Sequence, residues 1–186
     1  MRNESSVRRF IVTGAPGSGK TSILQALENL GYAVVEEAAT DAIAAQHAEG
    51  NLEPWRDPLF IDAIVRLQTH RQHERVREGA AVQVHDRSAV CTLALARWMD
   101  YPVTAELGEA VAQVTDEGLF DRRVFFVRPL GFCELTPVRR ISYEDSLEFE
   151  RVHVADPADR RQLADIPRGP VHQRAALIDA YLRSWA

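Results

Sequence analysis

A glycine-rich stretch near the start of the chain carries the clearest chemical signal. Its residues are Gly14, Ala15, Pro16, Gly17, Ser18, Gly19, Lys20 and Thr21. A glycine, four further residues and then Gly-Lys-Thr are typical of a loop whose backbone N–H groups surround nucleotide phosphates. The lysine of such a loop reaches the β- and γ-phosphates, and the next hydroxyl ligates Mg²⁺. The stretch, extended to Ser22, therefore predicts a site for ATP or GTP with Mg²⁺, in which Thr21 is a metal ligand.

The surroundings of this stretch support that interpretation. Residues 10–12 are apolar, as in a buried strand, and apolar residues then recur at helical spacing from Ile23 to Leu30, before Gly31. Lys20 is also the only lysine among 22 basic residues, the others being arginine. A compact ammonium fits a loop in which a planar guanidinium would be too bulky.

Strand and helix patterns alternate along the chain. Strands are expected at 10–12, 32–35, 80–85, 124–127 and 163–166. Helices are expected after the glycine-rich loop and at 38–49, 58–78, 88–99, 104–117 and 171–185. This alternation predicts an α/β fold with a parallel sheet, covered by helices on both faces, that binds ligands at the carboxyl ends of its strands.

Polar residues follow several of these strands and are expected to face one crevice together with the glycine-rich loop. They are Glu36, Glu37, Asp86, Arg87, Ser88 and Arg128. Asp86 ends a strand where a carboxylate commonly holds Mg²⁺, directly or through water. The alternative is that Asp86 only caps the helix beginning at Ser88. For the glutamate pair, the alternative is a solvated helix N-terminus, which favours negative charge.

Length and composition limit the classes of protein. The 186 residues suit one α/β domain spanning 1–186, and the net charge of −5 argues against general binding to nucleic acid. No apolar run approaches the roughly 20 residues that cross a bilayer, so we expect a cytoplasmic protein without a membrane partner. Cys91 and Cys133 lack a CxxC spacing and are expected to be reduced. The helices expected between 88 and 117 are apolar enough to pack on the core or on another subunit, so the sequence does not distinguish a monomer from a homo-oligomer.

Several stretches together resemble a known family. They are the 14–21 loop, Val-Val-Glu-Glu-Ala-Ala at 34–39, Pro54-Trp55, Asp86-Arg87-Ser88 and the strand at 124–127. The chain resembles the small P-loop proteins of the AAA_28 type, which include the ribosylnicotinamide kinase domain of the bacterial NAD regulator. The Asp-Arg-Ser triplet is also similar to that of deoxynucleoside and nucleoside-monophosphate kinases. The resemblance implies a three-layer P-loop NTPase fold with a five-stranded parallel sheet in the order 2-3-1-4-5.

The resemblance also implies roles for individual residues. It gives Lys20 and Thr21 the phosphate and magnesium roles, and Asp86 a role as metal ligand or base. Arg87 would hold the acceptor or the transferred phosphate. Glu37 would orient or deprotonate an acceptor hydroxyl, with Glu36 as the second choice.

Two further segments are candidates for closing the site and for binding the acceptor. The segment 128–143 lies where similar folds have a lid, and its Arg139 and Arg140 are expected to close over the γ-phosphate. The alternative is that these arginines pair on the surface with nearby acidic residues. On the helix beginning at residue 58, Gln68 and Arg71 are candidate acceptor contacts, against the alternative of a solvated polar face.

The sequence thus favours a Mg-ATP-dependent phosphotransferase acting on a small nucleoside-like or nucleotide-like molecule. The alternative is a non-kinase ATP/GTP-binding regulator or a slow NTPase. An Asn-Lys-x-Asp guanine motif does not occur, because Lys20 is the only lysine. An acceptor pocket beside the γ-phosphate distinguishes the two hypotheses, since a hydrolase needs room only for water.

Overall fold

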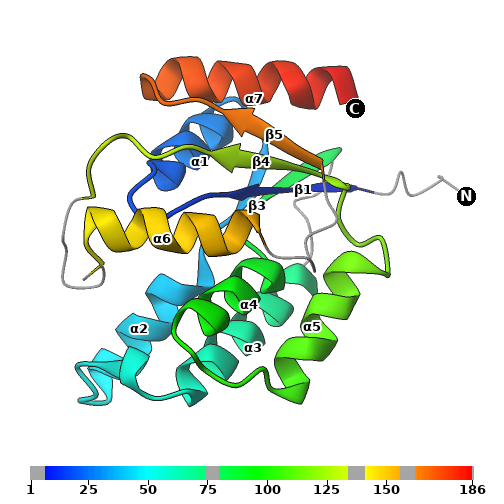
Figure 1. Ribbon diagram of the computed structural model, residues 1–186. Coiled ribbons are helices and arrows are strands. Elements are labelled where there is room, and N and C mark those ends of the chain that lie inside the picture. Colours follow the sequence, from blue (N-terminus) through cyan, green and yellow to red (C-terminus); the bar gives the residue numbers. More distant parts are fainter. Residues whose placement is uncertain (1–6, 74–79, 134–140, 156–161, 186) are drawn as a thin grey trace, which may run out of the picture.

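The sheet has the expected topology. The computed structural model describes residues 7–73, 80–133, 141–155 and 162–185 (Figure 1). Its five strands are all parallel and lie in the order β2-β3-β1-β4-β5. They are β1 (Arg8–Thr13), β2 (Ala33–Val35), β3 (Val82–Asp86), β4 (Arg123–Val127) and β5 (Gln162–Ile166). The predicted fold class and strand order are confirmed.

Helices cover both faces of the sheet. They are α1 (Lys20–Asn29), α2 (Ala38–Ala48), the 3₁₀ turn η1 (Pro54–Arg56), α3 (Leu59–His73), α4 (Ala89–Trp98), α5 (Ala105–Thr115), α6 (Tyr143–Val154) and α7 (Val171–Trp185). In Figure 1, α1 and α7 lie on one face, and α3, α4, α5 and α6 lie on the other. The result is a three-layer arrangement.

The side chains of β1 are buried on both faces of the sheet, as its central position requires. Phe10 and Val12 pack in the cluster formed with α1 and α7, whereas Ile11 packs in the cluster formed with α4 and α5. All three side chains have no exposed surface, because successive residues of a strand point to opposite faces. The glycine-rich loop therefore begins from a strand that is fixed on both faces.

The sequence patterns missed α6. The segment up to residue 143 was expected to form a lid, and no helix was expected after it. Ser142 caps the helix by accepting a hydrogen bond from the backbone N–H of Asp145 at 3.0 Å. The helix buries Phe149 beside Trp98 of α4, with ring centroids 6.1 Å apart. The Ser-x-x-Asp spacing is the signal that could have revealed it.

The other boundaries differ by a few residues. β3 includes Asp86, which was expected just after the strand. The helix expected to reach residue 78 is described as far as His73, and 74–79 lie outside the described residues. Gln83 and His85, which are unusually polar for a central strand, bond to each other at 3.0 Å in the core. Among the described helices, none is both long and apolar enough to cross a bilayer.

Asp121 joins β1 to β4 and gives a testable contribution to stability. It accepts hydrogen bonds from Arg123 and Arg8, each as short as 2.8 Å, and these bonds hold the pKa of Asp121 well below its usual range. Asp121→Asn should lower the free energy of unfolding by about 1–2 kcal/mol at pH 7. Because the folded-state pKa is depressed, this contribution is complete above the unfolded-state pKa of about 4 and declines as the pH falls below it.

Urea unfolding at several pH values tests this expectation. The difference between wild type and Asp121→Asn should shrink steadily from pH 5 to pH 2. Glu109→Gln, an exposed change on α5, serves as the control and should leave stability unchanged. A difference that is the same at pH 7 and pH 2.5 would show that the carboxylate charge is not the cause.

Candidate nucleotide and acceptor site

The glycine-rich loop connects β1 to α1 in a conformation that requires glycine. Gly14 has φ +141°, and a Cβ on it would lie 2.3 Å from the carbonyl oxygen of Val127 on β4. Gly19 precedes α1 with φ +85°, and this N-cap residue makes no side-chain hydrogen bond that caps the helix. The first N–H groups of α1 are therefore left for an anion, as in phosphate-binding helices.

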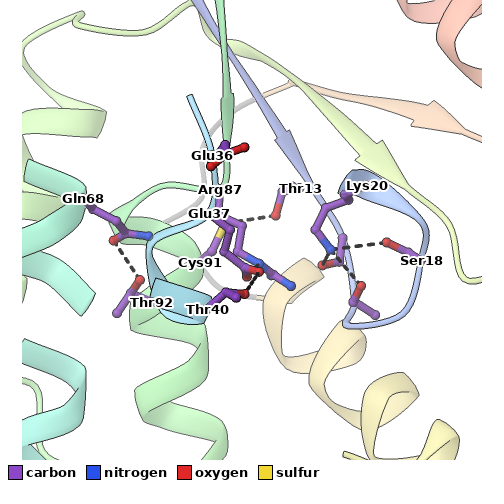
Figure 2. Close-up of polar contacts among 12 residues, drawn as sticks. Thr13, Ser18, Lys20, Glu36, Glu37, Thr40, Gln68, Arg87, Cys91 and Thr92 are labelled. Carbon is purple, nitrogen blue, oxygen red and sulfur yellow. Dashed lines mark hydrogen bonds and ion pairs between the residues drawn. The ribbon is translucent and has the colours of Figure 1, made fainter. Parts of the chain in front are cut away.

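Lys20 lies across this loop. Its Nζ donates to the carbonyl oxygens of Gly14 at 3.2 Å and Ala15 at 3.0 Å, and to Ser18 Oγ at 3.4 Å (Figure 2). Burial and, to a smaller extent, the positive charge of Arg87 lower the pKa of Lys20 to about 8. The ammonium is bound by neutral oxygens of the loop, which a phosphate can replace as partners.

Glu37 and Arg87 form an ion pair facing the loop. Arg87 Nε donates to Glu37 Oε1 at 2.5 Å, and Thr40 Oγ1 donates to the other carboxylate oxygen at 3.2 Å. Burial alone would raise the pKa of Glu37, but the charges of Arg87 and Lys20 outweigh it and lower the pKa. Figure 2 shows Glu36 apart from this pair, and its side chain is exposed. Of the two glutamates, Glu37 is therefore the one in the site.

The backbone at Arg87 explains how its side chain reaches Glu37. Arg87 has φ +70°, a left-handed conformation that costs a non-glycine residue of order 1 kcal/mol. Its N–H donates to the carbonyl oxygen of Val12 at 2.9 Å, which continues the pairing between β1 and β3. The strained turn directs the guanidinium across the end of the sheet.

Asp86 lies at the end of β3, immediately before this turn. Its side chain is buried, and Oδ1 has no hydrogen-bond partner among the residues that the structure describes. Burial raises the pKa of Asp86 to about 7, with the positive charge of Lys20 acting in the opposite direction. An unpartnered carboxylate oxygen beside the loop fits the oxygen donors that Mg²⁺ prefers, and Thr21 supplies a hydroxyl in the neighbouring cleft.

A cleft of about 530 Å³ extends from the loop across the carboxyl end of the sheet. At the loop it is lined by Pro16, Gly17, Gly19, Lys20, Thr21 and Ser22, with Glu37 and Arg87 opposite. Its far part is lined mainly by apolar and aromatic side chains: Ile43, Trp55, Phe60, Ile64, Leu95, Trp98, Met99 and Phe149. The space thus continues well beyond the volume needed for phosphates and water.

The two candidates on α3 have different positions. Gln68 is buried and lines the cleft, and Thr92 Oγ1 donates to its Oε1 at 2.9 Å (Figure 2). Arg71 does not line the cleft. It donates to the carbonyl oxygens of Glu36 and Glu37 at 2.8 and 2.9 Å and pairs with Asp41. Arg71 thereby fixes the turn that presents Glu37, a role that the sequence did not indicate.

The expectation that Arg128 faces the crevice is wrong. Arg128 pairs with Glu150 of α6 at 2.8 Å and with Asp165 of β5 at 2.7 Å, and it does not line the cleft. Glu150 lies on α6, which the sequence patterns missed, and Asp165 lies on β5, which they predicted only as a short strand. Without them, nothing in the sequence indicated a partner for Arg128.

The predicted lid is described at both of its ends. Leu130 and Phe132 after β4 and Ile141 before α6 line the cleft. Cys133 lies against the loop, with Sγ 3.7 Å from the carbonyl oxygen of Pro16. The lid arginines, Arg139 and Arg140, lie in 134–140, outside the described residues.

Comparisons with known proteins agree with this geometry. A family model described as an AAA domain, AAA_28, matches residues 9–174. No curated protein matches the chain. Among solved structures, shikimate kinase from Acinetobacter baumannii in complex with shikimate is similar in fold, with a TM-score of 0.53 and 15% sequence identity. The similarity covers 97% of this chain and 95% of the kinase chain.

Proposed function

The chain belongs to the AAA_28 family of AAA domains, and from this premise we propose that it is a Mg²⁺-dependent P-loop phosphotransferase. It transfers the γ-phosphoryl group of ATP, or of GTP, to a hydroxyl of a small nucleoside-like or nucleotide-like molecule. The observation that carries the proposal is the continuous cleft from the loop to an apolar chamber, with Glu37 in its lining. A hydrolase or a nucleotide switch does not need such a chamber.

The lining of the chamber supports an acceptor with a flat ring. Trp55, Phe60, Trp98 and Phe149 offer large aromatic surfaces, which bind planar rings by stacking or edge contacts. Gln68 adds an amide at the buried wall, and its bond to Thr92 restricts the orientation of that amide. An apolar slot with one oriented amide suits a nucleobase or a similar heterocycle, whose edge carries hydrogen-bonding atoms.

The proposed reaction assigns one role to each charged residue. The acceptor oxygen attacks the γ-phosphorus, the bond from this phosphorus to the β–γ bridging oxygen breaks, and the nucleoside diphosphate leaves. Glu37 accepts the proton of the acceptor hydroxyl, because its lowered pKa keeps it ionised at neutral pH. Lys20 and Arg87 stabilise the charge that develops on the phosphoryl oxygens. Arg139 and Arg140 are proposed to add positive charge when the lid closes.

Thr21 and Asp86 are the residues proposed to hold Mg²⁺. The Thr21 hydroxyl lies in the cleft, and Asp86 Oδ1 is the unpartnered buried oxygen described above. When bound, the ion neutralises charge on the β- and γ-phosphates. We place the reaction in the cytoplasm, where ATP is abundant.

A panel of acceptors tests the proposal. Wild-type protein with Mg-ATP is incubated with nucleosides, nucleoside monophosphates, ribosyl cofactor precursors and non-aromatic polyols, and ADP release is measured. At least one ring-bearing acceptor should raise the turnover at least about tenfold and yield one phosphorylated product per ADP. If every acceptor leaves only slow basal hydrolysis, the regulator or NTPase alternative replaces the kinase.

A further inference from the structure

Arg174 contacts the glycine-rich loop from outside the cleft. It lies in the first turn of α7, which packs beside α1 (Figure 1), and its residue surface is only 3% exposed. Nη1 donates to the carbonyl oxygen of Ser18 at 2.7 Å, and Nη2 donates to the carbonyl oxygen of Arg128 at 2.8 Å. The guanidinium thus connects the loop to the start of the segment after β4.

The charge of Arg174 has no acidic partner within the described part of the chain. Within residues 7–73, 80–133, 141–155 and 162–185, both of its bonds go to neutral carbonyl groups and its buried Nε has no partner; burial lowers its pKa. A cation in the first turn of a helix is also disfavoured by the helix dipole. A buried cation in this position lowers the stability of the fold unless an anion compensates its charge.

The contact with Ser18 determines the direction of a neighbouring N–H group. The Ser18 carbonyl and the Gly19 N–H belong to one planar peptide unit and point in opposite directions. Holding the carbonyl therefore fixes where the N–H points, and a charged donor on the carbonyl also polarises this N–H. Gly19 is adapted to this neighbour, since a Cβ on it would lie 3.3 Å from Arg174 Nη1.

Ser18 is bound by two cations. Lys20 Nζ donates to its side-chain oxygen at 3.4 Å, while Arg174 donates to its backbone oxygen. Positive charge therefore surrounds the loop on the cleft side and on the α7 side. A polyphosphate bound to the loop would compensate both charges.

We propose that Arg174 is a positioning residue for the nucleotide: its guanidinium holds the Ser18–Gly19 peptide so that the Gly19 N–H is already oriented toward phosphate. Its second bond, to the carbonyl oxygen of Arg128, fixes the position of the loop relative to the segment that follows β4. This proposal rests on the nucleotide-binding part of the proposed function and does not depend on the acceptor.

Calorimetry with Mg-ATP on folded protein tests this role. Arg174→Met keeps much of the side-chain volume but removes both bonds, and we expect the Kd for Mg-ATP to rise at least about tenfold, the equivalent of one charge-assisted hydrogen bond. Arg183→Met is the matched control on the same helix, because Arg183 is exposed and pairs with Asp179 at 3.0 Å, away from the loop. Its Kd should equal that of the wild type.

A second readout separates positioning from a general effect on stability. The amide resonance of Gly19 should shift strongly when ATP binds to the wild type and much less when it binds to Arg174→Met. A folded Arg174→Met protein with a Kd within threefold of the wild-type value would overturn the proposal. If this variant does not fold, Arg174→Lys decides, because it keeps the charge but not the two-carbonyl bridge: an unchanged Kd overturns the proposal, and a Kd raised threefold or more supports it.

The outcomes also separate this proposal from the proposed function. A wild-type protein that binds Mg-ATP but phosphorylates no acceptor would refute the phosphotransferase and leave the role of Arg174 open to the same comparison of Kd values. A wild-type protein that binds no Mg-ATP would overturn both.

Discussion

Lys20→Met is expected to reduce phosphotransfer from Mg-ATP by about 10³-fold or more. The ammonium is the cation inside the loop, and it is held there by neutral oxygens that phosphate can replace. Methionine keeps the apolar stem of the side chain and removes the charge, so the fold should persist while nucleotide binding and turnover fall. Steady-state kinetics and calorimetry with Mg-ATP measure these two effects.

The single lysine allows a direct control for this prediction. Apart from the α-amino group, Lys20 carries the only primary amine of the chain, so amine acylation reports on this side chain. Mg-ATP should protect it in the wild type, and adenosine, which has no phosphate, should protect it far less. A Lys20→Met enzyme that retains at least a tenth of the wild-type turnover would contradict the assigned role, and so would acylation that is unaffected by Mg-ATP.

Glu37→Gln is expected to lower kcat for acceptor phosphorylation by about 10²–10⁴-fold, the usual contribution of a general base. The change removes the carboxylate that accepts the hydroxyl proton and leaves Arg87, whose side chain is only 11% exposed, without its partner. The Kd for Mg-ATP should change little, because Glu37 lies opposite the loop. The free energy of unfolding should also fall, by about 1–3 kcal/mol, through the loss of the charged hydrogen bond.

The neighbouring glutamate provides a matched control. Glu36→Gln removes the same charge one residue earlier, but the Glu36 side chain is exposed and apart from the cleft. Its kcat should equal that of the wild type. Quenched-flow measurement of product formation, with basal ATP hydrolysis followed in parallel, isolates the acceptor step. Equal losses of kcat in Glu36→Gln and Glu37→Gln would mean that neither carboxylate acts as the base.

The parts of the site that lie close together in the sequence were predictable from it. The glycine-rich loop is one continuous stretch whose conformation depends on local backbone freedom, so residue types and spacing were sufficient to predict its place between β1 and α1. The strand order followed from the family resemblance rather than from periodicity. Gln68, one of the two candidate acceptor contacts on α3, lines the cleft rather than a solvated face.

The errors concern contacts between distant segments. Arg128 was expected in the crevice because it follows β4, but Glu150 and Asp165 draw it away. For Arg71 the alternatives were an acceptor contact and a solvated polar face, whereas the side chain binds the turn before α2. An arginine can extend in several directions, and the carboxylate that it meets decides which one it takes.

The sequence by itself determined that a glycine-rich loop lies between a buried strand and a helix, because the glycines, the lysine and the hydroxyl that define the loop are eight consecutive residues. Only the tertiary structure decided which glutamate faces the loop, how Asp86 is buried, and that Arg174, 156 positions away, holds the carbonyl of Ser18. The physical reason is that burial and long-range partners arise from packing, which no local pattern of residues specifies.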